Sequence, residues 1–319
     1  MGGDDWEKWE AVPLPAVRFS PWGDPYAEIF DWYPWMRNFY TTWEIEYNTR
    51  TMWTRLVAHS PWTPITICAL YLAFCYVGPK LMASRKPYNL KYSLVAWNFL
   101  LAAFSFVGAA RTVPHLLHVL YIYGFKYTIC YKPSVWYGSG AVGLWTQLFI
   151  LSKIPELGDT IFVVLRKRPL IFLHWYHHVT VLLYCWHSYY EQTTYGLYFV
   201  SMNYTVHALM YLYYGLAGLR IRLCQPYYIT TLQISQMVVG VGVCCSGGYF
   251  ISMGETKYIS KPNFQLGVLM YFSYMMLFLQ YAFGRFLPGG KKKVANGPTC
   301  GPGPVEPRNS QRKLETKVE

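Results

Sequence analysis

The residues best suited to chemistry are three histidines near the start of the apolar stretch from Leu170 to Trp186. His174 precedes His177 and His178 by about one helical turn, so a helix places the three imidazoles on one side. Ionisable side chains at membrane depth are costly and normally face a protein interior or an aqueous cavity. We therefore interpret this His-x-x-His-His cluster as a functional site, because packing alone rarely requires three imidazoles on one turn.

The preceding apolar stretch carries two carboxylates. Lys153, Glu156 and Thr160 share one helical face, and Asp159 follows one turn after the glutamate. Because isolated carboxylates in hydrocarbon must protonate or find partners, we expect both to pair with Lys153 and with imidazole N–H groups of the next helix. A structural alternative, in which the pair only joins two helices, would still orient the imidazoles by fixing their tautomers.

Two later apolar stretches also carry polar stripes. In the first, Asn203 lies one turn before His207 and can support it, and two tyrosines continue the same face. In the second, two glutamines lie three residues apart. Four successive stretches that each contribute polar side chains indicate a bundle around a polar site. The two later stripes comprise Asn203, His207, Tyr211 and Tyr214, followed by Gln233 and Gln236.

The composition indicates a membrane protein, because 53% of the 319 residues are hydrophobic and only 14% are charged. We predict an all-α integral membrane protein with an acidic, aromatic N-terminal segment (1–61), a seven-helix membrane domain (62–287) and a disordered tail (288–319). Short helical pieces are expected between Pro34 and Arg55. The predicted spans are Trp62 to Ser84, Tyr92 to Val113, Gly140 to Leu165, Leu170 to His187, Tyr195 to Tyr214, Tyr227 to Ile251 and Phe264 to Leu287. A long loop is expected from Tyr121 to Tyr137.

The formal net charge of +12 is unevenly distributed. Most acidic residues precede the first span, whereas basic residues gather in alternate loops. By the positive-inside rule the C-terminus is cytoplasmic and the N-terminus lies on the other side. Topology thus explains the basic charge, and a nucleic-acid partner is not favoured. The basic loops contain Arg85, Lys86 and Lys91; Arg166, Lys167 and Arg168; Arg220 and Arg222; and Arg285 with Lys291, Lys292 and Lys293.

The eight cysteines include no Cys-x-x-Cys pair, so neither a zinc site nor a dense disulfide framework is predicted. A bridge from Cys130 to Cys244 or Cys245 stays open. Cys185, seven residues beyond the histidine cluster, is an alternative nucleophile, although nothing in its sequence surroundings activates it.

In combination these motifs resemble those of the ELO fatty-acid elongases, the membrane-bound 3-ketoacyl-CoA synthases of the endoplasmic reticulum. The resemblance extends from about Pro61 to Phe286, and the lead into the histidines from Leu165 to Tyr176 looks like the branch that acts on saturated and monounsaturated chains. The motifs are Lys153-x-x-Glu156-x-x-Asp159-Thr160, His174-x-x-His177-His178, Asn203-x-x-x-His207-x-x-Met210-Tyr211-x-Tyr213-Tyr214 and Thr231-Leu232-Gln233-x-x-Gln236.

The resemblance implies seven transmembrane helices, six of them around a closed acyl tunnel. It also implies condensation of an acyl-CoA, of about palmitoyl length, with malonyl-CoA to give 3-ketoacyl-CoA, CO2 and CoA. No metal or other cofactor is expected. The implied partners are membrane lipid and the reductases and dehydratase of the elongation cycle, and a homodimer is left open. The location expected is the endoplasmic reticulum membrane, with a lumenal N-terminus.

A neutral imidazole can attack a thioester, and the acyl-imidazole formed is activated for transfer. On the resemblance, His177 is the acyl-accepting nucleophile, His207 its partner, and His174 and His178 orienting or oxyanion groups, with Asn203 in support. The implied substrate-binding and supporting residues are Lys153, Glu156, Asp159, Thr160, Tyr211, Tyr214, Gln233 and Gln236. The implied contacts to CoA phosphates are Arg166, Lys167, Arg168, Arg220 and Arg222.

Two other functions remain as alternatives. A di-iron membrane desaturase or hydroxylase also uses His-x-x-His-His boxes, but such sites need about eight imidazoles in three boxes, and only one box forms here. A seven-helix receptor or lipid carrier would bind acyl-CoA without turnover. Metal analysis and product analysis of the purified protein distinguish these alternatives from the elongase.

Overall fold

The computed structural model describes residues 18–54, 60–221, 223–256 and 258–286. This part of the chain is almost entirely helical. The two strands in it, β1 (Arg18–Phe19) and β2 (Pro25–Tyr26), form an antiparallel hairpin that pairs Arg18 with Tyr26. The predicted disordered tail, residues 288–319, lies outside the described residues.

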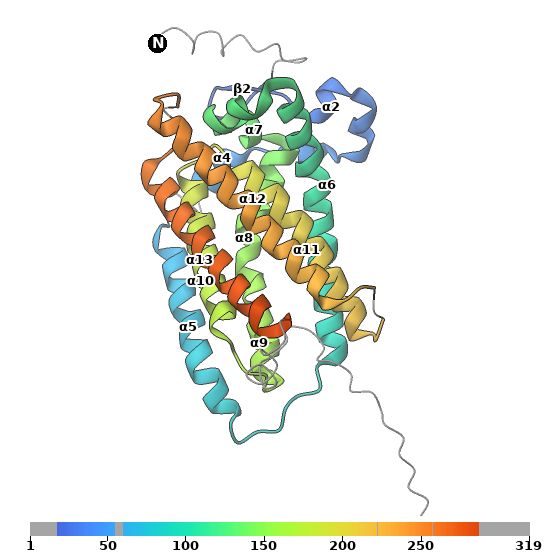
Figure 1. Ribbon diagram of the computed structural model, residues 1–319. Helices are drawn as coiled ribbons and strands as arrows, with labels where there is room; N and C mark the ends of the chain where they lie inside the picture. The colour runs from blue at the N-terminus through green and yellow to red at the C-terminus, as the bar shows by residue number, and fades with distance from the viewer. Residues whose placement is uncertain (1–17, 55–59, 222, 257, 287–319) are drawn as a thin grey trace, which may run out of the picture.

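Long helices run side by side and form an elongated bundle (Figure 1). Four helices in the described residues are long and apolar enough to cross a membrane, namely α5, α6, α12 and α13. The predicted class, an all-α integral membrane protein, is thereby confirmed, whereas seven spans and a barrel remain predictions. The helices are α5 (Trp62–Met82), α6 (Lys91–Cys130), α8 (Gly140–Glu156), α9 (Gly158–Leu165), α10 (Phe172–Tyr190), α11 (Gly196–Gly218), α12 (Pro226–Ser252) and α13 (Lys261–Phe286).

Helix α6 corrects the predicted end of the second span. The span predicted to end at Val113 continues through Pro114 as helix α6. The expected loop from Tyr121 to Tyr137 is mostly helical: α6 is interrupted by non-helical dihedral angles at Gly124 and resumes as far as Cys130. A short helix, α7 (Pro133–Tyr137), follows. Proline costs a helix one backbone hydrogen bond, and here side chains beyond it, such as Val119 at 1% exposure, are buried and retain the helix.

The predicted third span is divided in two. Helix α8 ends at Glu156 and α9 begins at Gly158, with Leu157 between them. Pro155 lies at the end of α8 and has no N–H to donate, which weakens the helix locally. At the junction the backbone N–H of Thr160 donates to the carbonyl of Leu157, three residues back rather than four.

Residues 18–54 form a cap over one end of the bundle (Figure 1). The short helices expected between Pro34 and Arg55 are present in its described part. Buried carboxylates attach the cap to the bundle: Glu28 accepts from the backbone N–H of Val142 at 3.0 Å, and Glu44 pairs with Arg111 at 2.8 Å. The cap helices are α2 (Ile29–Trp32), η1 (Pro34–Phe39), α3 (Thr42–Ile45) and α4 (Thr49–Met52).

The two cap carboxylates have opposite shifts in pKa. Burial raises the pKa of Glu28 to about 8, and the hydrogen bond from Val142 only partly offsets this effect. Burial also acts to raise the pKa of Glu44, but hydrogen bonds from Arg111, Thr41 and Trp145 outweigh it and lower the pKa to about 2. Glu28 is therefore protonated at neutral pH in the folded protein, and Glu44 is charged.

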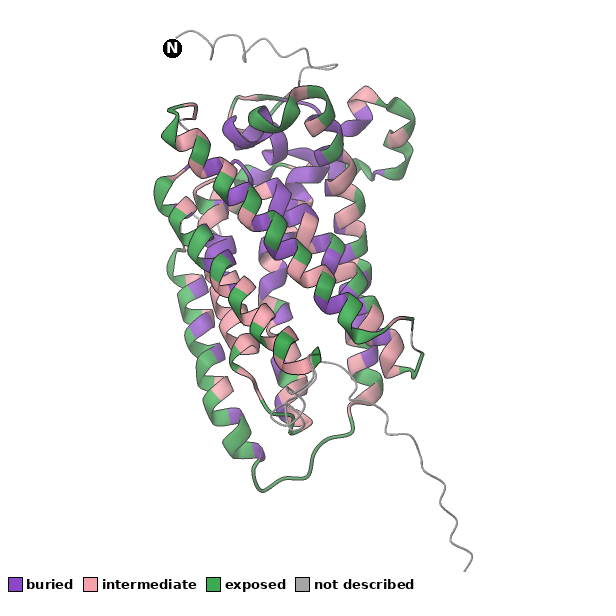
Figure 2. Ribbon diagram, viewed as in Figure 1, coloured by how far each residue is buried: buried purple, intermediate pink, exposed green. Residues whose placement is uncertain are grey.

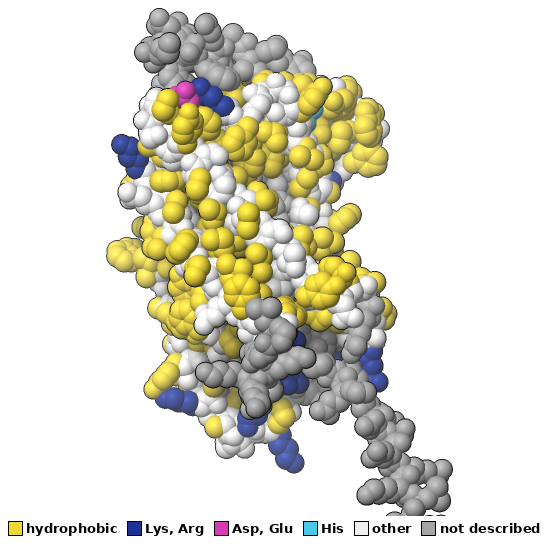
Figure 3. Space-filling view, viewed as in Figure 1, with side chains coloured by type: hydrophobic (Ala, Val, Ile, Leu, Met, Phe, Trp, Pro, Cys, Tyr) yellow, Lys and Arg dark blue, Asp and Glu magenta, His cyan; other side chains and the backbone are white. Residues whose placement is uncertain are grey.

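The loops at the opposite end carry the predicted basic residues and are tied together. The backbone N–H of Tyr88 donates to the carbonyl of Leu165 at 3.0 Å. The Lys167 ammonium donates to the carbonyls of Ala83 and Arg85 at 2.9 and 3.1 Å. Figure 3 shows lysine and arginine side chains gathered at this end, below a largely apolar flank.

The interior is packed most tightly next to the cap. Helix α11 lies along α6, α12 along α13, and α10 contacts α5, α8 and α13. Buried residues concentrate toward the capped end (Figure 2). Cys130, Cys244 and Cys245 are free thiols in the described structure, so the bridge considered from the sequence does not form.

Candidate active site

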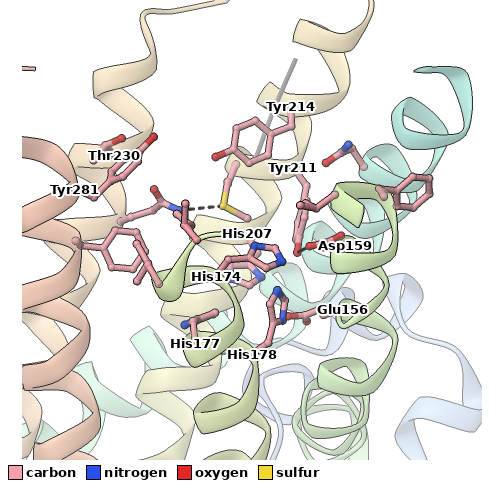
Figure 4. A pocket seen from close by; sticks show the side chains of 18 of the residues that line it. Glu156, Asp159, His174, His177, His178, His207, Tyr211, Tyr214, Thr230 and Tyr281 are labelled. Carbon is pink, nitrogen blue, oxygen red and sulfur yellow. Dashed lines mark hydrogen bonds between the residues drawn. The ribbon is translucent and has the colours of Figure 1, made fainter. Parts of the chain in front are cut away.

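A cavity of about 220 Å3 lies in the half of the bundle away from the cap. Helices α6 and α8 to α13 all contribute to its wall. Figure 4 shows the histidines in the middle, with Glu156 and Asp159 on one side and Thr230 and Tyr281 on the other. The predicted polar stripes therefore meet around one space. The motif residues that line it are Glu156, Asp159, His174, His177, His178, Asn203, His207, Met210, Tyr211, Tyr214, Gln233 and Gln236.

A chain of polar contacts links α8 to His207. The Lys153 ammonium, on a side chain 2% exposed, donates to the two Glu156 oxygens at 2.7 and 3.0 Å and to Oδ1 of Asn203 at 3.3 Å. Nδ2 of Asn203 lies 3.1 Å from Nε2 of His207. Because Oδ1 of the amide accepts from the ammonium, its NH2 group donates to the imidazole. The proton of a neutral His207 is then on Nδ1.

Asp159 has different partners from those predicted. Its oxygens accept from Nε1 of Trp97 at 2.6 Å and from the hydroxyl of Tyr211 at 2.9 Å. Glu156 likewise accepts from Lys153 and from the hydroxyl of Ser152. The pairing with Lys153 was correctly predicted for Glu156 but not for Asp159, and an indole and hydroxyls take the place of the expected imidazole donors. Sequence spacing could not reveal the two donors to Asp159, because Trp97 lies on α6 and Tyr211 on α11.

Thr160 is the residue of α9 that contacts the histidine cluster. Its Oγ1 lies 2.9 Å from Nε2 of His174 and 2.8 Å from the hydroxyl of Tyr71. The ring of His174 is 4.6 Å from that of His178, centroid to centroid. The ring of His174 is thus oriented by a hydrogen bond with a threonine hydroxyl and not, as expected, with a carboxylate.

His177 lies between this cluster and α13. Its ring is 5.7 Å from that of His178 and 4.9 Å from that of Tyr274, and the Tyr274 hydroxyl donates to its backbone carbonyl at 3.2 Å. Nδ1 of His177 is buried and has no hydrogen-bond partner in the described residues. His177 therefore differs from His174 and His207, each of which has a ring nitrogen engaged by a neighbouring side chain.

The basic residues predicted to bind phosphates divide into two groups. Arg166 and Arg168 line the cavity, at the loop that joins α9 to α10. Lys167 is not part of the cavity wall, and its ammonium joins two loops by donating to the carbonyls of Ala83 and Arg85. Arg220 is exposed and is not part of the cavity wall. Arg222 lies outside the described residues.

Other wall residues could not be identified from the motifs. Gln233 donates to the sulfur of Met210 at 3.1 Å, which joins two predicted stripes. Asn98, an isolated polar residue within an apolar span, is a signal that sequence analysis could have used. The further unpredicted wall residues include Asn98, Phe162, Thr230, Phe278 and Tyr281.

The structure also bears on two alternatives, a Cys185 nucleophile and a di-iron site. Cys185 is buried in α10 and is not part of the cavity wall. In the residues that the structure describes, no group of three or more His, Cys, Asp and Glu side chains is arranged to hold a metal ion. The imidazoles contact a threonine and an amide instead, an arrangement that does not favour the di-iron alternative.

The sequence of the chain is similar to those of known fatty acid elongases. The chain is 45% identical over 232 residues to very long chain fatty acid elongase 6 of Drosophila melanogaster, which covers 70% of this chain and 72% of that protein. It is 42% identical over 224 residues to the Homo sapiens protein of the same name, and the match covers 69% of this chain and 82% of that protein. Putative fatty acid elongase 3 of Caenorhabditis elegans is 44% identical over 227 residues, covering 70% of each chain. Because the model of the ELO (GNS1/SUR4) family matches residues 56–294, a range that contains helices α5 to α13 and the entire cavity wall, the chain belongs to the ELO family.

Proposed function

We propose that this protein is the condensing enzyme of fatty-acid elongation, which joins a long-chain acyl-CoA to malonyl-CoA and releases CoA and CO2. The observation that carries the proposal is His177: it lines the cavity, and its Nδ1 is buried without a hydrogen-bond partner in the described residues. An imidazole with an unengaged lone pair is a competent nucleophile toward a thioester. Family membership and the printed names of the relatives support the same reaction.

In the first half-reaction a ring nitrogen of His177 attacks the thioester carbonyl of the acyl-CoA. The carbon–sulfur bond breaks, the acyl group forms a bond to the ring nitrogen, and CoA leaves with the proton given up by the imidazole. The Asn203–His207 pair lines the same cavity and can donate a hydrogen bond to the oxyanion that develops on the carbonyl. The acyl-imidazole so formed remains an activated acyl donor.

In the second half-reaction malonyl-CoA loses CO2, and the electrons of the broken carbon–carbon bond form a thioester enolate. The enolate carbon attacks the acyl carbonyl, and the bond to the His177 nitrogen breaks to give 3-ketoacyl-CoA. The imidazole takes up a proton and is ready for another cycle. A buried site suits this sequence, because water would hydrolyse the acyl-imidazole.

The substrate we propose is an acyl-CoA of about palmitoyl length, saturated or monounsaturated. Arg166 and Arg168 line the cavity beside the histidines and are suited to the phosphates of CoA. The names of the relatives support a role in fatty acid elongation, and the chain length rests on the resemblance of the segment from Leu165 to Tyr176. No cofactor is needed, since decarboxylation of malonyl-CoA supplies the nucleophile.

We further propose seven membrane spans, in which α8 and α9 together count as one, and six of them surround a closed acyl tunnel. The basic loops at the end away from the cap support a cytoplasmic location for that end, with the cap on the lumenal side of the endoplasmic reticulum. The reductases and dehydratase that process the product in the elongation cycle are the proposed partners, and a homodimer is compatible with the fold.

The proposal is tested by incubating purified protein with palmitoyl-CoA and with malonyl-CoA, singly and together. We expect palmitoyl-CoA alone to release about one CoA per chain and to increase the mass of the intact protein by one acyl group, mapped to His177. Addition of malonyl-CoA should then yield a 3-ketoacyl-CoA two carbons longer. Binding of palmitoyl-CoA without release of CoA would overturn the proposal in favour of a carrier.

A further inference from the structure

We infer that Tyr71, on α5, is a positioning residue for the histidine cluster: acting through Thr160, it fixes His174 as the tautomer that carries its proton on Nδ1. This inference rests on the proposed function for its catalytic meaning. Its structural part concerns only which ring nitrogen of His174 carries the proton. Helix α5 packs mainly against α9 and α10, and it contributes no residue to the cavity wall.

Three polar groups, on Tyr71, Thr160 and His174, follow one another within hydrogen-bonding distance. The Tyr71 hydroxyl lies 2.8 Å from Oγ1 of Thr160, which lies 2.9 Å from Nε2 of His174. Tyr71 is 5% exposed and Thr160 is fully buried, so water does not compete for these hydrogen bonds. The ring of Tyr71 also lies 6.0 Å from that of His178, centroid to centroid. Tyr71 therefore lies directly behind the histidine cluster, although it is not part of the cavity wall and no motif includes it.

The hydroxyl of Thr160 is available because the helix is broken beside it. Three other threonines in long helices, Thr112, Thr180 and Thr205, donate to the carbonyl four residues back. For Thr160 that carbonyl belongs to Glu156, on the far side of the break at Leu157. The hydroxyl of Thr160 is instead joined to Tyr71 and His174, the two partners that the described structure gives it.

The direction of the chain follows from the number of protons. A threonine hydroxyl has one proton and can donate only once, although its oxygen accepts as well. The phenolic proton of Tyr71 is buried and needs an acceptor, and the Thr160 oxygen is the one that the geometry provides, since the sulfur of Cys75 one turn away is a weak acceptor. Tyr71 therefore donates to Thr160, and Thr160 donates to Nε2 of His174.

This arrangement assigns His174 a role different from that of His177. The Nε2 lone pair of His174 is occupied by the Thr160 hydroxyl and is not available to attack a thioester. Its ring is held beside His178, at 4.6 Å between centroids, in one orientation. With the reverse tautomer, His174 Nε2–H and the Tyr71 hydroxyl would both donate to the Thr160 oxygen, and the Thr160 proton would have no acceptor among these groups. Without the Tyr71 hydroxyl, the Thr160 side chain is no longer held as the donor to His174, so we expect both tautomers.

The test compares Tyr71→Phe, which removes only the hydroxyl, with Tyr76→Phe on the exposed face of the same helix, where the side chain is 66% exposed. We expect Tyr71→Phe to lower kcat by about tenfold, the factor that corresponds to one ordinary hydrogen bond, with little change in KM for palmitoyl-CoA. Tyr76→Phe should match the wild type. Equal kcat values for all three proteins would overturn the inference.

Two further measurements separate positioning from a loss of folding. Thr160→Val removes the hydroxyl at constant shape and should lower kcat at least as far as Tyr71→Phe, whereas Thr160→Ser should restore it. In protein labelled with 15N-histidine, nitrogen–proton correlations identify the tautomer of His174, whose signals are those lost in His174→Gln. We expect the Nδ1–H tautomer in the wild type and a mixture in Tyr71→Phe.

An Nε2–H tautomer in the wild type, or identical spectra for Tyr71→Phe and the wild type, would contradict the inference whatever the activity. If the wild type forms no 3-ketoacyl-CoA, the proposed function fails, and the spectra still decide the tautomer. If the wild type is active and Thr160→Val equals Thr160→Ser in kcat, the inference fails while the proposed function stands.

Discussion

The two ends of the bundle differ in how their interiors are filled. Buried residues gather next to the cap (Figure 2), where every residue from 127 to 144 except Lys132 is buried. Aromatic rings pack against one another there, as in the stack of Tyr127 on Tyr131, whose ring centroids lie 4.5 Å apart. At the other end, only Val164 of residues 162 to 177 is buried, and a cavity of about 220 Å3 remains. Because protein interiors are normally close-packed, a cavity lined by polar side chains is the best candidate for a functional site.

Both ends bury carboxylates, but for different purposes. Glu28 and Glu44 join the cap to helices more than sixty residues away in sequence, through Val142 and Arg111. Glu156 pairs with a lysine three residues before it, and that lysine continues to Asn203 and His207. At the filled end buried carboxyl groups, neutral in Glu28 and charged in Glu44, hold elements together, whereas at the hollow end the Lys153–Glu156 ion pair orders side chains that line the cavity. The following predictions test this difference.

The largest effect is expected at the hollow end from His177→Ala. Loss of the nucleophile should lower kcat at least about a thousandfold and abolish the acyl adduct, with an unchanged melting temperature. Intact-protein mass spectrometry after exposure to palmitoyl-CoA measures the adduct. The control is His187→Ala on the same helix, where the ring bonds to Asn263 away from the cavity, and which should retain the adduct. An adduct in His177→Ala would move the nucleophile to another residue.

Glu156→Gln should cost about 3 to 5 kcal/mol in the free energy of unfolding, because it leaves the Lys153 ammonium buried without its counter-charge. The matched control at the capped end is Glu255→Gln, which breaks the exposed pair with Lys126 and should cost less than about 1 kcal/mol. Denaturant unfolding in mixed micelles measures both. Equal losses would show that burial does not separate the two pairs.

Gly140→Ala tests the attachment of the cap. Gly140 has a φ of +67°, and a Cβ there would overlap Oε1 of Glu28. We expect a loss of about 1 to 3 kcal/mol in the free energy of unfolding, without a change in KM. Gly23→Ala is the control, because Gly23 has a φ of +84° but nothing within 4 Å of the added atom. If Gly23→Ala costs as much, the contact with Glu28 contributes nothing.

An effect that appears as a dependence on pH is expected from Glu28→Gln. The folded protein holds the Glu28 proton up to a pKa of about 8, and the unfolded chain releases it near 4.5. Stability from this group is thus fully present below about pH 4.5 and falls as pH rises toward 8, by at most about 1.4 kcal/mol per unit. The glutamine variant should lack that decline when unfolding is measured from pH 5 to 8. A decline equal to that of the wild type would contradict the buried, protonated state.

Much of the site was predictable because its contacts are local. Lys153 with Glu156 and Asn203 with His207 are three and four residues apart, and helix geometry alone brings them together. The membrane class followed from the length and hydrophobicity of the spans. The prediction failed at α6, where the second span was expected to end at Val113, because packing against α11 continues the helix through Pro114.

The sequence by itself determined which side chains share a helical face, since spacing of three and four residues fixes that locally. Only the tertiary structure decided which face meets which: Asp159 bonds to Trp97 and Tyr211, and Thr160 to Tyr71, from helices at least fifty residues away. It also decided that Lys167 joins two loops while the arginines beside it line the cavity. The physical reason is that rotation and depth of a helix are set by packing against its neighbours, which no local pattern records.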